Sequence, residues 1–161
     1  MTIEDYNKAV EQHADSIHRF ILKNCRNEDL AQDVVQESFE KLWVKLDNVA
    51  GEKAKSYLFT TAYHTMVDVL RKEKRITDFD QANEGKHAHS EQYSDLGEVL
   101  ERALKQIPEI QRTVILLRDY EGYSYGEIAE ITGLSESQVK VYIYRGRLNL
   151  KSFLVKIENV I

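Results

Sequence analysis

This chain of 161 residues has little cysteine and little proline, with one residue of each. A single thiol, Cys25, excludes an intrachain disulfide and a cysteine-based metal cluster, and it is typical of a reduced intracellular protein. Because proline interrupts helices, its scarcity favours long helices. The chain also lacks a basic start followed by an apolar run, and it has no apolar stretch long enough to cross a bilayer. We therefore expect a cytoplasmic protein with no membrane span.

Charge is abundant but unevenly distributed along the chain. Charged residues make up 30% and hydrophobic residues 42% of the sequence, which indicates a globular rather than a disordered protein. The net charge of −5 argues against nucleic-acid binding by the chain as a whole. Residues 134–161, however, carry five basic and two acidic side chains, and local charge is what meets phosphate. The C-terminal segment is therefore a candidate nucleic-acid surface.

Apolar residues in the first half of the chain recur at the three- and four-residue steps of an amphipathic helix. The first such stripe contains Tyr6, Val10, His13, Ile17 and Phe20. Similar stripes predict a second helix over residues 28–46 and a third over residues 53–75. Three helices with short connections predict a small bundle.

The segment over residues 81–97 has no apolar period and is rich in small, polar and acidic residues, which is typical of a linker. After it, apolar spacing predicts a helix that Pro108 ends and another over residues 113–120. We expect an all-α protein in which an N-terminal three-helix bundle (residues 1–79) and a C-terminal four-helix domain (residues 98–161) are joined by a flexible linker (residues 80–97).

Two helix starts lie close together near the C-terminus. Ser124 with Glu127, and Ser135 with Gln138, each fit a capping box, in which both side chains satisfy amides at the start of a helix. Gly133 lies between them, where a left-handed backbone is easily adopted only by glycine. This pattern predicts a helix-turn-helix in the C-terminal domain.

The second helix of this motif has a polar face suited to a DNA groove. Its donors, cations and one aromatic edge are Ser137, Lys140, Tyr144, Arg145, Arg147 and Lys151. Such a helix fits the major groove. Two capped helices around a glycine also occur in unrelated helical proteins, and a basic face is often only solvated, so the motif alone leaves both interpretations open.

Three ordered motifs give the chain a resemblance to a known family. They are EDLAQDVVQESFEKLW (residues 28–43), YLFTTAYHTMVDVLRKEKR (residues 57–75) and LKQIPEIQRTVILLRDYEGYSYGEIAEITGLSESQVKVYIYRGRLNL (residues 104–150). With these motifs, the chain resembles the extracytoplasmic-function (ECF) class of bacterial RNA polymerase sigma factors from about Tyr6 to Phe153. The resemblance implies a promoter-specificity subunit that binds core RNA polymerase and directs transcription initiation at specific promoters, with no catalysis and no cofactor of its own.

The resemblance also implies a role for each half. Residues 1–79 would bind core polymerase and melt the minus-ten element, and residues 98–161 would read the minus-thirty-five element of promoter DNA. An anti-sigma factor is a further partner that is common in the family. In the family an acidic helix face docks on the polymerase, and the corresponding residues here are Asp29, Asp33, Gln36, Glu37 and Glu40.

The DNA contacts implied by the resemblance fall in both halves. In the family the loop matching residues 47–56 captures a flipped base, and the helix after it holds the separated strands. The implied residues of the first half are Lys53, Lys55, Tyr63, His64, Arg71, Lys72, Lys74 and Arg75, and those of the second half are Ser137, Gln138, Lys140, Val141, Tyr144, Arg145 and Arg147. Tyr57 and Phe59 could belong either to this surface or to the core.

Two of these positions depart from the usual family pattern. His64 stands where the family often has Asn, and Gln138 stands where it often has Thr. Both positions lie near expected DNA surfaces. They therefore leave open which promoter sequence the chain recognises, but they do not weaken the resemblance to the family.

Two other classes of function remain as alternatives. One is a stand-alone helix-turn-helix regulator with a sensory N-terminal half, although the chain has no Gly-rich phosphate loop. The other is an enzyme or metalloprotein. Its candidates are His13 with His18, His87 with His89, and Cys25. They are weak, because the first two histidines are five residues apart on different helix faces and the other two lie in the linker without a third ligand.

The linker predicts how the two halves relate in the free protein. An acidic, solvated tether does not fix two small domains relative to each other, so we expect them to move independently until core polymerase holds them at the promoter spacing. The alternative is that the domains pack together and hide the basic helix.

Overall fold

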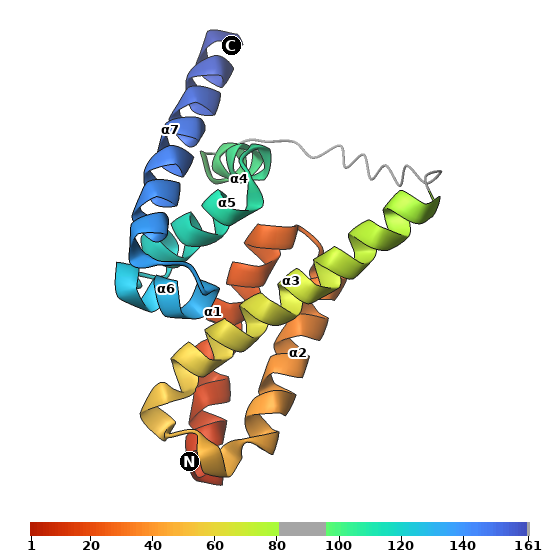
Figure 1. Cartoon of the computed structure of the whole chain (residues 1–161), viewed down its shortest axis with the longest axis vertical. Helices are drawn as coiled ribbons and strands as arrows, with labels where there is room; N and C mark the ends of the chain where they lie inside the picture. Colours follow the sequence, from red (N-terminus) through yellow and green to blue (C-terminus); the bar gives the residue numbers. More distant parts are fainter. Residues whose placement is uncertain (81–95, 161) are drawn as a thin grey trace.

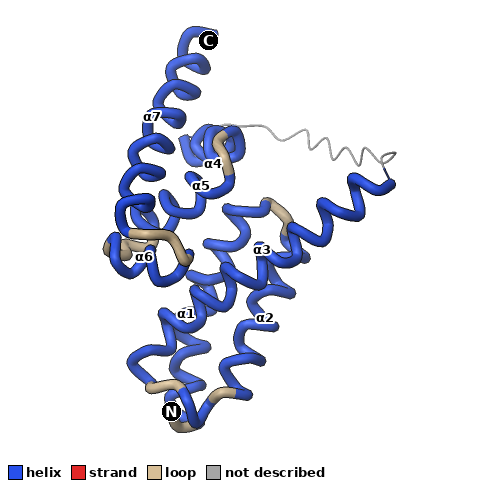
Figure 2. The backbone as a smooth tube through the Cα atoms, viewed as in Figure 1, coloured by secondary structure: helices blue, strands red, loops and turns tan. Residues whose placement is uncertain are grey.

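The structure is a computed structural model that describes the backbone of residues 1–80 and 96–160 and the side chains of residues 1–76 and 97–156. In this part of the chain every regular element is helical, so the predicted all-α fold is confirmed (Figures 1 and 2). The α-helices are α1 (Ile3–Cys25), α2 (Glu28–Val44), α3 (Ala54–Asp80), α4 (Leu96–Gln106), α5 (Glu109–Ile115), α6 (Tyr125–Thr132) and α7 (Glu136–Val160). Short 3-10 turns at Leu46–Asn48 and Gly51–Lys53 lead into α3, and a π-helical turn at Leu116–Tyr120 extends α5.

Local signals explain where the first helices start and stop. Thr2 and Asp5 form a capping box at the start of α1, and Arg26 ends that helix in a left-handed conformation with φ of 57°. Asn27 then caps α2 by accepting a hydrogen bond from the backbone amide of Leu30. The turn between α1 and α2 therefore needs only two residues, which holds these helices side by side.

Three boundaries differ from those predicted from the sequence. Helix α3 continues to Asp80 rather than ending at 75, and α4 begins at Leu96, inside the predicted linker. Pro108 ends α4 as expected but also starts α5 at Glu109, because its fixed φ suits a helix start and its carbonyl accepts from the amide of Arg112. Residues 81–95, most of the predicted linker, lie outside the described residues.

The N-terminal bundle has its core where α1, α2 and α3 meet. Ile17, Phe20, Leu42, Leu58 and Met66 are all fully buried there. In the predicted stripe of α1 only the C-terminal residues are fully buried, since Tyr6, Val10 and His13 are half-buried. Tyr6 instead packs edge-on against Trp43 and donates a hydrogen bond from its hydroxyl to the carbonyl of Phe39.

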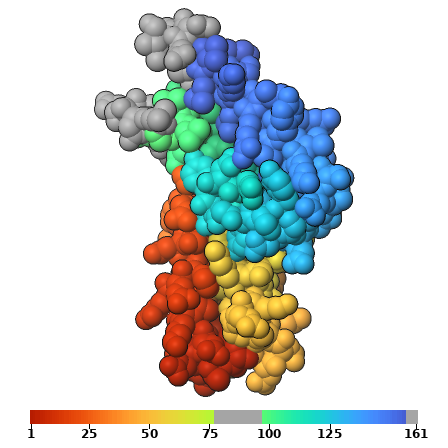
Figure 3. Space-filling view, turned by 90° about the vertical axis from the view of Figure 1, so that its left-hand side faces the viewer, coloured from red at the N-terminus to blue at the C-terminus, as the bar shows by residue number. Residues whose placement is uncertain are grey.

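The two halves of the chain lie against each other (Figure 3), and their buried apolar residues form one continuous hydrophobic core. Helix α6 lies along α3, and α5 with its π-helical turn contacts α1. Inside this interface the Thr113 hydroxyl donates to Asn24 Oδ1 over 3.0 Å, and the Tyr123 ring meets Phe59 edge-on. Of the two arrangements considered from the sequence, the structure therefore shows the one in which the halves pack together, while independent motion of the free halves stays a prediction. The helical period predicted one buried face on each helix. It did not predict the second buried face at which the two halves meet.

Candidate nucleic-acid and partner interfaces

The helix-turn-helix forms as its sequence predicts. Ser124 Oγ accepts from the amide of Glu127, whose carboxylate accepts in turn from the amide of Ser124. Ser135 and Gln138 make the same pair of hydrogen bonds at the start of α7. Between them Gly133 has φ of 81°, in the left-handed region that favours glycine. Both capping boxes and the glycine turn are confirmed.

The C-terminal domain also depends on a glycine that the sequence analysis did not single out. A Cβ atom placed on Gly146 would lie 2.5 Å from Ile115 Cδ1 and 3.2 Å from Gln111 Cβ. Helix α7 therefore crosses α5 so closely that any larger residue at this point requires the Ile115 side chain to shift. Its signal in the sequence is a glycine within a long amphipathic helix, where it weakens the helix unless close packing requires it.

Helix α7 presents its predicted DNA-binding side chains to solvent. Val139 and Ile143 are buried beneath it, as expected. The exposed residues of the predicted set are Ser137, Gln138, Lys140, Val141, Tyr144, Arg145 and Arg147. Tyr144 is 66% exposed, more than any other large hydrophobic side chain described on α7. This face is therefore open to a partner even though the two halves are packed together, so the alternative that packing hides the basic helix does not hold.

Some of these side chains are already held by neighbours. The Arg147 guanidinium donates two hydrogen bonds to the Asp119 carboxylate, over 2.6 and 3.2 Å, and these bonds raise the pKa of Arg147. Lys140 Nζ lies 5.5 Å from the centre of the Tyr125 ring, close enough for a cation–π contact. The Gln138 side chain accepts a hydrogen bond from the amide of Ser135 in its capping box. The cations are thus positioned along the edge of α7 that faces α6 and the π-helical turn.

The acidic set on α2 forms one exposed surface, which we call the acidic face. Its members are Asp29, Asp33, Gln36, Glu37 and Glu40. They lie opposite the buried residues Ala31, Val34 and Leu42. Gln36 donates to Glu40, and Lys41 forms an ion pair of 3.4 Å with Glu37 on a half-exposed surface. Most of the negative charge of this face is therefore free to meet a basic surface.

Helix α3 and the 3-10 turn before it divide their predicted DNA contacts between the surface and the core. Lys53 and His64 are exposed, as are the four cations of its C-terminal part, Arg71, Lys72, Lys74 and Arg75. Lys55 is half-buried, with Nζ lying 5.0 Å from the centre of the Tyr123 ring.

Two aromatic residues of α3 belong to the core. Tyr63 is only 9% exposed, and burial raises its pKa. In this conformation the ring is therefore not part of the surface, and the DNA contact expected of Tyr63 stays a prediction. Phe59 is fully buried beside Tyr123, while Tyr57 stays half-buried at the surface. The sequence left both Tyr57 and Phe59 unassigned. In the structure Phe59 belongs to the core and Tyr57 to the surface.

Two hollows border α3. One, of about 690 Å³, lies between α2 and α3 and is lined by residues that include Glu37, Lys41 and His64. The other, of about 520 Å³, is formed by the loop before α3 with Lys53, Tyr57 and Thr60, and we call it the loop cavity. Glu130 of α6 also lines the loop cavity, so one of its walls comes from the other half of the chain.

The histidines, the cysteine and the carboxylates of the described part of the chain were the candidates for a metal site. No three His, Cys, Asp or Glu side chains there gather closely enough to hold a metal ion. His18 pairs with Glu28, burial is the main cause of a raised pKa for the Cys25 thiol, and His87 and His89 lie outside the described residues. None of the described helices is long and apolar enough to cross a membrane.

Comparison with known families gives matches in both halves. The family model described as Sigma-70 region 2 matches residues 9–76, and the one described as Sigma-70, region 4 matches residues 97–150.

Known relatives are similar to the chain over nearly its whole length. RNA polymerase sigma factor SigV of Bacillus subtilis is 33% identical over 153 residues, covering 91% of this chain and 89% of the relative. RNA polymerase sigma factor YlaC of the same organism is 29% identical over 165 residues, covering 96% of this chain and 93% of the relative.

A solved structure is also similar. Sigma factor RpoE from Bartonella quintana, in complex with the anti-sigma factor NepR, superposes with a TM-score of 0.80 at 27% identity, covering 94% of this chain and 97% of that one.

Proposed function

This chain belongs to the extracytoplasmic-function class of RNA polymerase sigma factors, and we propose that its two halves divide promoter recognition between them. As a sigma factor it is a promoter-specificity subunit that binds core RNA polymerase and directs transcription initiation at specific promoters. This assignment excludes the alternative of a stand-alone regulator. We further propose that the chain acts in the cytoplasm, where its polymerase is, and contributes specificity without catalysing a reaction itself.

The N-terminal half binds core polymerase through the acidic face of α2. This proposal is supported by the position of Asp33, Glu37 and Glu40 on the solvent side of a well-packed helix, where they can change partners without disturbing the core. Complementary charge raises the rate of association and suppresses wrong partners. The acidic face is the observation that carries the proposal for this half.

The same half melts and holds the minus-ten element with the loop before α3 and with α3 itself. The loop cavity is large enough to receive a base, and Tyr57 at its wall offers a ring for stacking. Base stacking on an aromatic side chain is worth about 1–3 kcal/mol. The exposed cations between Arg71 and Arg75 follow the strand backbone.

The C-terminal half reads the minus-thirty-five element with α7. Lys140 and Tyr144 lie one helical turn apart on its exposed face and contact base edges in the major groove. Arg145 and Arg147 contact phosphates and set the register of the helix on the duplex. The exposure of this face in the packed molecule supports the assignment.

Charge reversal on the acidic face tests the polymerase contact. We expect the double variant Asp33→Lys, Glu37→Lys to lose co-purification with core polymerase while keeping its helical content, because both positions are exposed. The matched control is Glu11→Lys with Asp15→Lys, which reverses two exposed charges at the same spacing on α1. Equal binding by both double variants would show that the acidic face is only a solvated surface.

A further inference from the structure

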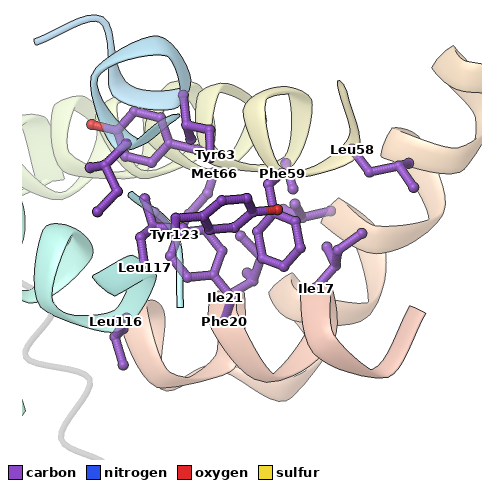
Figure 4. Packing of buried hydrophobic residues seen from close by; sticks show 14 of the residues in the cluster. Ile17, Phe20, Ile21, Leu58, Phe59, Tyr63, Met66, Leu116, Leu117 and Tyr123 are labelled. Atoms are coloured by element: carbon purple, nitrogen blue, oxygen red, sulfur yellow. The ribbon is translucent and has the colours of Figure 1, made fainter. Parts of the chain in front are cut away.

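The π-helical turn that extends α5 has a buried beginning and an exposed end. Its first residues, Leu116 and Leu117, are fully buried and lie in the core (Figure 4). The amide of Glu121 closes the turn by donating a hydrogen bond of 3.0 Å to the carbonyl of Leu116. Between these points Asp119 is exposed. Wide turns of this kind are rare in helices and frequent at functional sites, which makes the exposed side chain of this turn a candidate for a role.

Arg118 fixes the turn against the start of α6. Its Nη1 donates to the carbonyl of Tyr123 over 2.9 Å, and its guanidinium carbon lies 4.4 Å from the centre of the Tyr125 ring. Tyr125 is the first residue of α6. The turn is thus held by the core on one side and by the helix-turn-helix on the other, so the next side chain, Asp119, leaves it from a defined place.

Asp119 reaches across to the DNA-binding helix. Arg147 Nη2 donates to Asp119 Oδ1 over 2.6 Å, and Arg147 Nε donates to Asp119 Oδ2 over 3.2 Å. Two parallel hydrogen bonds between a planar guanidinium and a carboxylate fix the plane of the guanidinium as well as its distance. The π-helical turn therefore sets the orientation of a cation on α7.

The contact leaves part of the guanidinium for another acceptor. Nε and one N–H of Nη2 are engaged with Asp119, whereas Nη1 has no acceptor among the described residues. The side chains of Arg147 and Asp119 are 50% and 38% exposed, so a partner can reach this free edge. Two neighbouring N–H groups of a guanidinium match the oxygens of a phosphate. Arg147 can thus hold Asp119 with one edge and a phosphate with another.

Charge alone predicts that Asp119 hinders DNA binding. A carboxylate repels a nearby phosphate, so an acidic side chain on the DNA side of the domain should weaken binding. An unpaired Arg147, however, would lose the rotational freedom of its side chain on meeting a phosphate. Ordering such a side chain weakens binding by about two- to tenfold. Repulsion and positioning by Asp119 therefore predict opposite effects of removing it.

We propose that Asp119 is a positioning residue for promoter recognition, which holds the Arg147 guanidinium so that its free edge meets a phosphate of the minus-thirty-five duplex. The proposal rests on the phosphate contact that the proposed function assigns to Arg147. Asp119 acts through Arg147 and touches no DNA itself. The π-helical turn makes this possible, because its buried leucines and Arg118 fix the backbone from which Asp119 extends.

The pair is not needed for folding. An ion pair at this exposure contributes little to the stability of a protein, so Asp119→Ala should leave the helical content and the thermal unfolding of the chain nearly unchanged. Effects of this substitution on DNA binding can therefore be measured on a folded protein.

NMR of the isotope-labelled full chain tests whether Asp119 holds Arg147. The Nε–H signal of Arg147, identified by its absence in Arg147→Ala, should be separate from the signals of exposed arginines and should exchange slowly with water. In Asp119→Ala it should move to the position of the exposed arginines. A signal that Asp119→Ala leaves unchanged would overturn the proposal, whatever the affinity of the chain for polymerase.

Titration of duplex DNA with the reconstituted holoenzyme tests the effect on recognition. The probe is a labelled template that the unmodified holoenzyme selects from a library randomised across the promoter region. Asp119→Ala should weaken binding about two- to tenfold although it removes a negative charge. The matched control Glu136→Ala removes another exposed carboxylate, at the start of α7, and should bind as tightly as the unmodified chain or more tightly.

A double variant separates positioning from an independent contact. If Asp119 acts only through Arg147, adding Asp119→Ala to Arg147→Ala should cause no further loss of affinity. Additive losses would contradict positioning, and so would an Asp119→Ala holoenzyme that binds as tightly as the Glu136→Ala control. Failure of the unmodified holoenzyme to select any template would instead contradict the proposed function, while the NMR spectra would still decide whether Asp119 holds Arg147.

Discussion

Arg147 and Lys140 carry the same charge on the same helix, but their neighbours differ. Arg147 is held by two hydrogen bonds to Asp119, so its guanidinium has a defined direction before DNA arrives. Lys140 has a cation–π contact with Tyr125, with no hydrogen bond or ion pair to another described side chain. A pre-positioned cation suits the phosphate backbone, which has the same geometry at every sequence, whereas a side chain that can adjust suits base edges.

Replacing Arg147 with Ala should therefore weaken minus-thirty-five binding about equally for all sequences. The salt dependence of binding is the slope of log affinity against log salt concentration. Losing one phosphate contact reduces the magnitude of this slope by about 1. The measurement is a titration of duplex DNA with the reconstituted holoenzyme at several salt concentrations.

The matched control for this substitution is Lys156→Ala, which removes an exposed cation of α7 far from the helix-turn-helix. It should leave the slope unchanged. A loss of affinity confined to a single base pair in the Arg147 variant would assign base reading to Arg147 and contradict its positioning role.

Residues differ in how well the sequence predicts their place. Gly133, Ser124 and Ser135 act through neighbours within a few positions, so their roles follow from local pattern alone. Phe59 and Tyr63 could not be assigned in this way. Phe59 is covered by Tyr123, which lies far along the chain, and helical spacing contains no information about which distant residue covers a side chain.

At the scale of elements, the close crossing of α5 and α7 fixes how the helices of the DNA-binding domain pack together. Gly146→Ala should destabilise the fold by about 1–3 kcal/mol, because the added Cβ overlaps Ile115 in a filled core. Thermal or denaturant unfolding of the variant measures this change.

Gly126→Ala provides a matched control on the neighbouring helix. A Cβ atom at Gly126 meets nothing within 4 Å, so alanine there should be neutral or stabilise the fold by about 0.5–1 kcal/mol. Equal stability changes in the two variants would show that α5 and α7 do not cross as closely as described.

Helix boundaries show the limit of sequence prediction for elements. The starts of α6 and α7 were predicted because each has a capping box, and the start of α2 was predicted from apolar spacing alone. The end of α3 at Asp80 and the start of α4 at Leu96 were missed, because polar and acidic residues continue past both points without a change in apolar period. A helix end without a local stop signal depends on tertiary context.

At the scale of the whole molecule, the two halves are packed against each other in this structure. The sequence predicted both halves and their family but not their contact, since the contact joins α6 to α3 and the π-helical turn to α1. A linker of suitable composition permits independent motion but does not require it, and buried apolar area decides between the two.

The central claim is that this chain gives core RNA polymerase its promoter specificity through two separate surfaces. It is tested most directly by transcription from a DNA library randomised across the promoter region, with core polymerase and the added chain, followed by sequencing of the transcribed templates. We predict that transcription depends on the chain and that the selected templates share two sequence blocks at constant spacing. Lys140→Ala with Tyr144→Ala should relax only the upstream block. Selection no different from that of core polymerase alone, or selection that these substitutions leave unchanged, would contradict the account.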